Sequence, residues 1–237
     1  MLKTRQGESD LILFRHQFYL SATCEIDEPI PTEGQDVLGL DLGVVNIAVD
    51  SDGHVYSGKT LNQVRYRNRR LRAKLQSKSA QRPNRKVKRA AKRLLKKLSG
   101  KEARFARQIN HTISKQVVKL VQDTGRDIAL EDLSGIRERI TVRRDQRATL
   151  HSWSFYQLRS FLAYKSKMTG VRLILVDPRN TSRTCPACGC VSKHNRSTQS
   201  SFKCVECGFS GFADHVASEN IRRLAVNRAN LSARTKG

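Results

Sequence analysis

Four cysteines in two close pairs restrict the fold of the C-terminal part of this chain more than any other feature of its sequence. Cys185 and Cys188 form the first pair, Cys204 and Cys207 form the second, and fifteen residues separate the inner cysteines. This spacing is typical of a structural zinc site, in which four thiolates complete a tetrahedron and leave no position open for catalysis. A glycine follows each pair and permits the tight turn of a knuckle. We therefore predict a zinc ribbon, bound to Zn²⁺, over residues 181–211.

Two neighbouring residues, Cys190 and His194, are alternative zinc ligands, but neither has a partner at the paired spacing. A position on a surface loop explains both of them more simply. Paired cysteines indicate a metal site rather than disulfides when a protein stays in a reducing compartment. The N-terminus shows no signal-type apolar stretch, and no apolar run approaches the roughly 20 residues that cross a bilayer. We therefore expect a cytoplasmic protein without a membrane partner.

The chain is strongly basic, with a net charge of +24 and a pI near 10.5. Most of this charge lies between Arg65 and Arg107, where 19 lysines and arginines accompany a single acid, Glu102. A segment of this kind makes salt-dependent contacts with phosphates and carries no base-specific information. A solvated helix face is the alternative explanation, but it does not account for so one-sided a charge. Nucleic acid is the expected partner.

Hydrophobic periodicity gives the order of the secondary structure. Alternating or continuous apolar runs predict strands at residues 11–14, 18–26, 37–43, 45–49, 54–56, 127–133 and 171–176. A period near 3.6 predicts helices at 61–122, with breaks at 83–84 and 99–100, at 153–168 and at 213–229. The inward-facing residues of the last two helices are expected to be Phe155, Leu158, Leu162, Tyr164, Ala217, Ile221 and Leu224. A basic loop at 137–147 completes the pattern, and the order of the elements is that of an RNase H-like α/β domain.

This order predicts four regions along the chain. A strand pair and a linker occupy 1–35, and an RNase H-like core with a basic helical hairpin inserted at 61–100 occupies 36–180. The zinc ribbon at 181–211 and a C-terminal helix and tail at 212–237 complete the chain. A two-stranded ribbon alone is marginal in water, so the N-terminal pair is expected to pack on another element or to belong to a larger domain.

Three acidic residues are the candidate catalytic groups and Mg²⁺ ligands. Asp41 stands inside an apolar strand, Glu131 ends another strand, and Asp214 begins the last helix. In an RNase H-like layout the first and fourth strands are neighbours and the last helix packs across them, which brings the three carboxylates together. Carboxylates are the hard ligands that Mg²⁺ prefers, and two metals about 4 Å apart support phosphodiester hydrolysis.

Each acid also has a structural explanation when it is taken alone. Asp41 can be a buried, backbone-bonded residue, Glu131 a charge at a strand end, and Asp214 a helix N-cap. Asp132 competes with Glu131 because the two point to opposite faces of the strand. Ala129 shares the face of Glu131, and a small residue beside an acid favours that face as the site.

At this point the sequence resembles the TnpB/OrfB proteins of insertion sequences, which are related to type V CRISPR effectors. The resemblance rests on Gly-Leu-Asp-Leu-Gly at 39–43, Leu-Glu-Asp-Leu at 130–133, the segment 181–189, the second knuckle, and Ala-Asp at 213–214. It implies a RuvC nuclease core whose Asp, Glu and Asp correspond to Asp41, Glu131 and Asp214. It also implies a zinc ribbon that contacts the target and guidance by an RNA made from the transposon end.

The chain departs from the family pattern in two respects. Typical members have an Asn two residues after the last acid, where this chain has Val216, and they carry a longer N-terminal half. The leading hypothesis is a Mg²⁺-dependent DNA endonuclease, guided by RNA. The alternatives are a catalytically idle nucleic-acid-binding fragment or regulator, favoured by the short N-terminal part, and a ribosome-type zinc-ribbon protein, which leaves the three acids unexplained. The sequence does not predict the oligomeric state.

Overall fold

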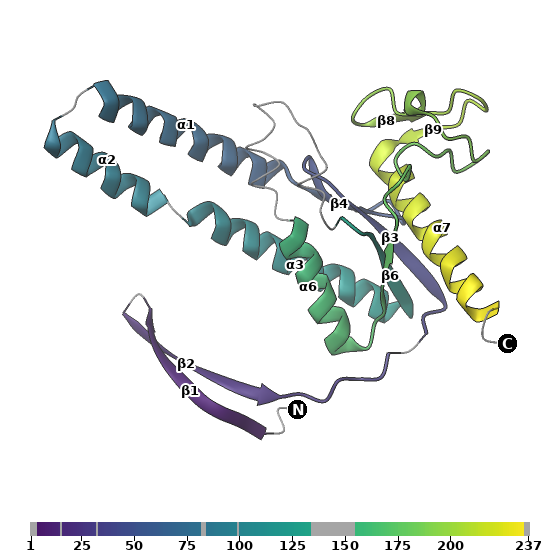
Figure 1. Cartoon of the computed structure of the whole chain (residues 1–237), viewed down its shortest axis with the longest axis horizontal. Coiled ribbons are helices and arrows are strands. Elements are labelled where there is room, and N and C mark those ends of the chain that lie inside the picture. The colour runs from purple at the N-terminus through teal and green to yellow at the C-terminus, as the bar shows by residue number, and fades with distance from the viewer. Residues whose placement is uncertain are drawn as a thin grey trace.

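The computed structural model describes residues 4–14, 16–31, 33–81, 84–98, 100–133 and 155–234. At its centre lies a five-stranded mixed sheet with helices on both faces, so the predicted α/β class is confirmed (Figure 1). The basic loop predicted at 137–147 lies outside the described residues. Among the helices that the structure describes, none has the length and apolar composition needed to span a membrane.

The central sheet has the strand order β5-β4-β3-β6-β7. Its members are β3 (Asp36–Leu42), β4 (Asn46–Asp50), β5 (Val55–Ser57), β6 (Arg126–Glu131) and β7 (Leu173–Val176). Antiparallel pairing joins β3 to β4 and β4 to β5, whereas β6 runs parallel to both β3 and β7. The first and fourth strands of this domain are therefore neighbours, as the sequence predicted.

Different helices cover the two faces of the sheet because successive side chains of a strand point to opposite sides. One face packs against α3 (Lys101–Asp123) and α6 (Phe155–Thr169), and the buried strand residues there are Leu38, Leu40, Ile128 and Leu130. The opposite face, which carries Val37 and Ala129, packs against α7 (Ala213–Arg234). Figure 1 shows α7 crossing the sheet on the side away from α3 and α6. The core therefore has two layers of helices with the sheet between them.

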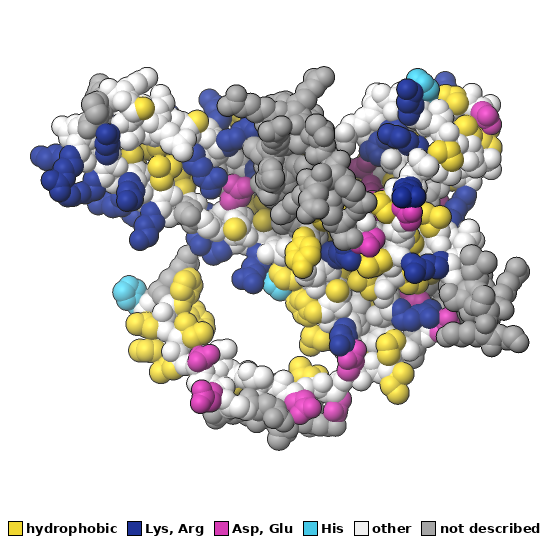
Figure 2. Space-filling view, in the orientation of Figure 1, with side chains coloured by type: hydrophobic (Ala, Val, Ile, Leu, Met, Phe, Trp, Pro, Cys, Tyr) yellow, Lys and Arg dark blue, Asp and Glu magenta, His cyan; other side chains and the backbone are white. Residues whose placement is uncertain are grey.

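Two basic helices extend from this core. They are α1 (Lys59–Gln81) and α2 (Arg85–Leu98), and the chain then continues into α3. The described helices end before and begin after the breaks that the sequence predicted at 83–84 and at 99–100. The two helices lie side by side and project away from the sheet, and lysine and arginine side chains gather over them (Figures 1 and 2). We call α1 and α2 the basic helical pair.

Two of the residues expected to face inward are exposed. Tyr164 is 41% exposed, because it follows the buried Leu162 by two residues and so lies on the opposite side of α6. Leu224 is also 41% exposed, because the buried stripe of α7 runs through Ala217, Ile221 and Ala225, and Leu224 lies at its edge. The remaining predicted inward residues of these two helices are buried.

The N-terminal hairpin pairs β1 (Thr4–Phe14) with β2 (Gln17–Glu25) and begins earlier than the sequence predicted. The turn passes through His16, which has a positive φ of 64°. Large apolar side chains of both strands are exposed, among them Leu13, Phe18 and Leu20. In Figure 1 the hairpin lies apart from the central sheet and is joined to it by an extended segment.

A small module of turns and short strands separates β7 from α7. It contains the 3₁₀ turn η1 (Lys193–Asn195) and the antiparallel pair β8 (Ser201–Lys203) and β9 (Ser210–Phe212). Its own small core consists of Phe202, two cysteines, and the first turn of α7. The module therefore rests on the start of α7, at the end of the sheet where β3 and β6 finish (Figure 1).

Candidate functional site

Two carboxylates lie at the carboxyl ends of the two central strands. Leu40 of β3 pairs with Leu130 of β6 in parallel register, and Asp41 and Glu131 each follow one residue later. Because side chains alternate along a strand, both carboxylates point to the side of Ala129, which α7 covers. The two predicted strand acids therefore lie next to each other on one face of the sheet.

The start of α7 brings a third carboxylate to the same place. α7 approaches β3 closely because Gly39 has no side chain. A Cβ atom at that position would lie 2.1 Å from the carbonyl oxygen of Ser218 and 2.7 Å from the backbone nitrogen of Arg222. The glycine therefore sets the distance between the helix and the strand, and with it the position of the first turn of α7 over Asp41.

Asp214 lies within the first turn of α7 and is buried. Its carboxylate accepts a hydrogen bond from Asn46 Nδ2 at 3.0 Å and another from Arg196 Nη2 at 2.9 Å. The carboxylate therefore faces the sheet and the cysteine-containing module, and the N-cap explanation weighed from the sequence does not describe these contacts. We call Asp41, Glu131 and Asp214 the acidic cluster.

Burial disfavours the ionised form of two carboxyl groups in the acidic cluster, and neighbouring negative charges add to this effect at Asp41. Burial raises the pKa of Asp41 to about 8, and the charges of Glu131 and Asp214 act in the same direction. Burial also raises the pKa of Glu131, although a hydrogen bond from Thr181 and the charge of Arg196 oppose this effect. Buried like charges disfavour ionisation unless a cation accompanies them. The arrangement is therefore suited to hold cations.

Asp132, the competitor of Glu131, points elsewhere. Its carboxylate forms an ion pair with Arg159 Nη1 of α6 at 2.9 Å, and its side chain is 43% exposed. The strand alternation predicted this separation, since Asp132 shares the face of Leu130 and Glu131 shares that of Ala129. Geometry thus groups Glu131, and not Asp132, with Asp41.

A buried polar brace fixes Glu131. The Thr181 hydroxyl donates a hydrogen bond to Glu131 Oε1 and also contacts the carbonyl of Pro178. Asn220 of α7 is buried, and its Nδ2 donates to the carbonyls of Thr181 and Thr184 at 2.8 Å each. The segment that follows β7 is therefore tied both to an acid of the cluster and to the helix that carries another.

Sequence analysis missed Arg196 and Asn46, which both contact Asp214. Arg196 also donates to the carbonyl of Gln199 at 2.8 Å and thereby links the cysteine-containing module to the acidic cluster. Nothing in the sequence distinguishes this arginine from the other basic residues of a chain that has 45 of them. Asn46 stands at the start of β4 next to the turn after β3, and a polar residue at that place was the only available signal.

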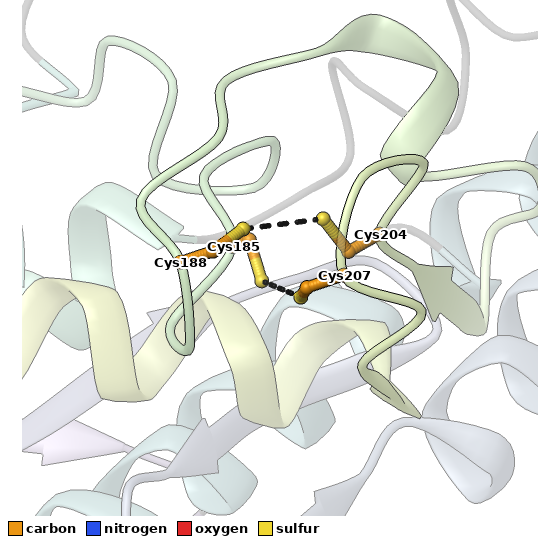
Figure 3. Close-up of side chains that lie close together, drawn as sticks. All are labelled: Cys185, Cys188, Cys204 and Cys207. Carbon is orange, nitrogen blue, oxygen red and sulfur yellow. Dashed lines mark hydrogen bonds between the residues drawn. The ribbon is translucent and has the colours of Figure 1, made fainter.

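The four paired cysteines meet at one point (Figure 3). All their sulfur atoms lie within 4.8 Å of one another, with 3.6 Å between the sulfurs of Cys185 and Cys207 and 3.5 Å between those of Cys188 and Cys204. Backbone N–H groups of Cys207 and of the residue before it lower the pKa of Cys204 to about 6. A thiolate is therefore favoured at this position, as metal binding requires. We call these four residues the cysteine cluster.

Neither alternative ligand joins the cysteine cluster within the described residues. Cys190 packs beside the small core of the module, and His194 is exposed. Buried Asn195 organises the module instead, because its Nδ2 donates to the carbonyls of Arg183 and Cys190, and its Oδ1 accepts from the backbone N–H of Val205. One side chain thus joins the first knuckle to the second.

Two family models match this chain, and each match contains part of the site. The family described as "Probable transposase" (OrfB_IS605) matches residues 21–136, and the Cas12f1-like TNB domain matches residues 155–221. The TnpB-like protein MJ0751 of Methanocaldococcus jannaschii is 31% identical over 202 residues, which cover 81% of this chain and 69% of that protein. The chain belongs to the TnpB/OrfB family.

This TnpB/OrfB member is also similar to CRISPR-associated proteins. The CRISPR-associated endodeoxyribonuclease Cas12f1 of Sulfoacidibacillus thermotolerans is 36% identical over 125 residues, which cover 52% of this chain and 28% of that protein. A solved complex of Cas12f1 with sgRNA and target DNA has a TM-score of 0.58 at 20% identity, over 86% of this chain and 53% of that one. The chain therefore shares the fold of these proteins and spans only part of their length.

The two family matches divide the acidic cluster between them. Asp41 and Glu131 lie in the transposase-type match, and Asp214 lies with the cysteine cluster in the TNB-type match. The TnpB/OrfB fold brings the two segments together at the end of β3 and β6. The site is therefore assembled from both halves of the sequence.

Proposed function

We propose that this TnpB/OrfB protein is a Mg²⁺-dependent DNA endonuclease with an RNase H-like (RuvC) core. The observation that carries the proposal is the acidic cluster, in which three carboxylates from β3, β6 and α7 meet at one end of the sheet. The strand order and the relatedness to an endodeoxyribonuclease support it. In this proposal the core occupies 36–180, with the basic helical pair as an insertion.

The residues present suit divalent cations. Burial raises the pKa of Asp41 most, and the charges of Glu131 and Asp214 raise it further; a bound cation would favour the ionised carboxylate again. Asp41, Glu131 and Asp214 would supply the oxygen ligands. Divalent cations at such a site activate water and stabilise the charge that develops on the leaving oxygen.

Other side chains keep the carboxylates in position. Thr181 holds Glu131 through its hydroxyl, and Asn46 holds Asp214 from β4. Arg196 pairs with Asp214 and lowers the pKa of Asp41, so it offsets part of the negative charge. Glu131 and Asp214 are thus oriented before a substrate binds, which is what positioning of a reaction requires.

The cysteine cluster is proposed to hold a structural Zn²⁺. Tetrahedral coordination by thiolates at about 2.3 Å places the sulfurs about 3.8 Å apart, and the two closest pairs lie at 3.5 and 3.6 Å. Four protein ligands leave no open position, so the metal would serve to fold residues 181–211. That module contains Arg196, which contacts Asp214 of the acidic cluster. The proposed zinc site is therefore linked to the proposed catalytic site.

We propose DNA as the substrate and a guide RNA as a further partner. The net charge of +24 supports a polyanionic partner, and the basic helical pair provides an extended surface for phosphates. The similar Cas12f1 complex contains both sgRNA and target DNA. In this proposal residues 1–35 contribute a strand pair and a linker, and residues 212–237 contribute the C-terminal helix and tail of the core.

Cleavage assays on purified protein test the proposal. Single- and double-stranded DNA is incubated with Mg²⁺ or with a chelator, with and without RNA co-purified from cells that carry the adjoining transposon end. We expect Mg²⁺-dependent cleavage that falls by at least about a hundredfold in Asp41→Asn, since a metal ligand is lost while the size of the side chain is kept. Asp132→Asn is the matched control and should retain the activity.

The opposite outcome identifies the second candidate function. Salt-sensitive binding of DNA or RNA by both variants, without cleavage by the wild type under any of these conditions, would leave a nucleic-acid-binding protein or regulator. Equal cleavage by the wild type and Asp41→Asn would assign the activity to another site or to a contaminant.

A further inference from the structure

The second helix of the basic helical pair, α2, is divided lengthwise into a basic half and an apolar half. Successive side chains of an α-helix lie about 100° apart around its axis, because a turn contains 3.6 residues. On this wheel one half of the circumference holds every lysine and arginine of α2, at Arg85, Lys86, Lys88, Arg89, Lys92, Arg93, Lys96 and Lys97. The other half holds all its remaining residues, which are Val87, Ala90, Ala91, Leu94, Leu95 and Leu98. We call the first set the basic half of α2.

The apolar half attaches α2 to the rest of the protein. Ala91 is buried there, and Val87, Leu95 and Leu98 are half-buried. α2 lies alongside α1 and reaches the start of α3 (Figure 1). The basic half therefore points away from the packed side of the helix, and all its side chains are exposed.

The charge of the basic half is not neutralised within the protein. α2 contains no acid, and no carboxylate in the described part of the chain forms an ion pair with a lysine or arginine of this helix. Like charges four residues apart, such as those of Lys88 and Lys92, destabilise a helix. The fold thus keeps an arrangement that costs stability, and a polyanionic ligand gives a reason for it.

The basic half faces two sides at once. One flank carries Lys88 and Lys92, and the other carries Lys86 and Lys97, so that the outermost side chains lie about 180° apart around the helix axis. A single strand offers one row of phosphates and would engage one flank at a time. A groove of a double helix has a row of phosphates along each side, so both flanks can bind together.

The dimensions of α2 select the kind of double helix. An α-helix with its side chains is about 10–12 Å across, and the major groove of B-form DNA is about 12 Å wide and admits a helix. The major groove of A-form RNA is deep and narrow and does not. Proteins that bind single strands commonly stack bases on aromatic side chains, and α2 contains no aromatic residue.

We infer that the basic half of α2 lies in the major groove of double-stranded DNA and contacts the phosphates of both strands. The 14 residues of α2 span about 21 Å, which corresponds to about six base pairs at 3.4 Å each. Phosphate contacts position a protein without reading sequence, so the form of the nucleic acid decides the binding. The inference rests on the proposed binding of DNA and requires neither a guide RNA nor cleavage.

Equilibrium binding of the full chain to short oligonucleotides of equal length tests the inference. Duplex DNA, duplex RNA and single-stranded DNA are compared for the wild type and for the double variant Lys88→Gln with Lys92→Gln, which removes one flank. We expect this variant to bind duplex DNA about tenfold more weakly and to reduce the slope of log K against log salt by about two. The losses with duplex RNA and with single-stranded DNA should be smaller.

A second double variant controls for the loss of charge alone. Lys115→Gln with Lys119→Gln removes two exposed lysines at the same spacing from α3. It should change the affinity for duplex DNA by less than about twofold, because surface charges farther away than the Debye length are screened at physiological salt.

Methylation by dimethyl sulfate separates the groove from the outside of the duplex. This reagent attacks guanine N7, which lies in the major groove, and adenine N3, which lies in the minor groove. In a duplex of about 12 base pairs saturated with the wild type, we expect protection of guanine N7 and continued reaction at adenine N3. The double variant of α2, at equal saturation, should protect guanine N7 less.

Three results would overturn the inference while leaving nucleic-acid binding intact. They are equal losses in the two double variants, an equal or larger loss of the α2 variant on duplex RNA or single-stranded DNA, and unprotected guanine N7 in saturated duplex DNA. Failure of the wild type to bind any of the three nucleic acids would overturn the proposed DNA partner as well.

Discussion

At the scale of single residues, the fold keeps charges in places where an isolated charge would be unfavourable. Asp41 is surrounded by a sheet, a helix and two further acids, and its pKa rises to about 8 as a result. A stable core has no need for such a group, because an apolar residue of similar size would pack there without the desolvation cost. The acidic cluster is therefore better explained by a bound cation than by stability.

Asp52 illustrates the opposite case, a carboxylate that stabilises the fold. It accepts two hydrogen bonds from Arg126, at 2.9 and 2.7 Å, and these bonds lower its pKa below the ordinary value of 3.8. A lowered pKa in the folded state stabilises the protein above the ordinary value, and the stabilisation disappears as the pH falls through the lowered one. The pair joins the β4-β5 turn to the start of β6.

We expect Asp52→Asn to lower the free energy of unfolding by about 0.5–1 kcal/mol near neutral pH, since the pair is partly exposed. Asparagine keeps the turn preference of the Asp-Gly pair, so the effect isolates the charge. Urea unfolding of both proteins from about pH 7 to about pH 3 should show the difference shrinking only below the ordinary pKa. Asp177→Asn, at an exposed ion pair with Arg179, is the control. A difference that stays constant to the lowest pH would contradict the role given to this ion pair.

The residues of the site were predictable from the sequence to different degrees. Asp41 stands out because an acid inside an apolar strand needs an explanation, whereas Asp214 at a helix start could equally be an N-cap. Glu131 could be separated from Asp132 only by the small residue that shares its face. Arg196 and Asn46 could not be predicted, because their contacts with Asp214 depend on how the cysteine-containing module and β4 pack against α7.

At the scale of secondary-structure elements, the close approach of α7 to β3 determines whether the acidic cluster forms. Gly39→Ala would place a Cβ against the backbone of α7, which cannot move aside as a flexible side chain could. We expect a loss of about 1–3 kcal/mol in the free energy of unfolding. Gly211→Ala, where the nearest atom would be Val216 Cγ2 at 3.4 Å, should change little. Equal stability of the two variants by urea unfolding would contradict the tight contact between α7 and β3.

The cysteine cluster makes its own prediction at this scale. Purified protein should contain one Zn²⁺ per chain, and Cys204→Ser should hold less, because one thiolate of the tetrahedron is lost. Cys24→Ser, at a cysteine of β2 far along the chain, is the matched control and should keep its zinc. Metal analysis together with limited proteolysis of residues 181–211 measures the effect. Full zinc content and unchanged protection in Cys204→Ser would exclude the cluster as the metal site.

Element boundaries in the central sheet and the long helical region followed from the sequence within a few residues because apolar periodicity, glycine and proline acted together, whereas β1 begins at Thr4, seven residues before the predicted strand. The two breaks in the long helical region and the five strands of the sheet are examples. The wrong inward faces had different causes, because Leu224 lies at the edge of the buried stripe of α7, whereas Tyr164 lies on the side of α6 opposite to Leu162. Periodicity gives the centre of a buried face more reliably than its margin.

At the scale of the whole molecule, the acidic cluster and the basic surface belong to different secondary-structure elements. The sheet and its helices carry the acidic cluster, while the basic helical pair carries 16 of the 45 lysines and arginines and no acid, and Figure 2 shows basic side chains gathered over it. In the proposed function, a polyanion that binds the basic helical pair lies on the same protein surface as the route to the acidic cluster only if the two are bridged by the bound strand, which the cleavage assay tests. The order of elements indicated which strands would be neighbours, but the position of the cysteine-containing module beside the acids emerged only from the structure.

Binding of Mn²⁺, as a substitute for Mg²⁺, tests the acidic cluster most directly because it requires neither guide nor target. Free Mn²⁺ is measured by electron paramagnetic resonance during titration of the purified chain, with the wild type, Asp41→Asn and Asp132→Asn compared at the same pH. We predict saturable binding by the wild type and Asp132→Asn, and a loss of at least about tenfold in affinity in Asp41→Asn. Equal affinities in all three proteins, or no saturable binding by the wild type, would contradict a divalent-cation site at Asp41, Glu131 and Asp214.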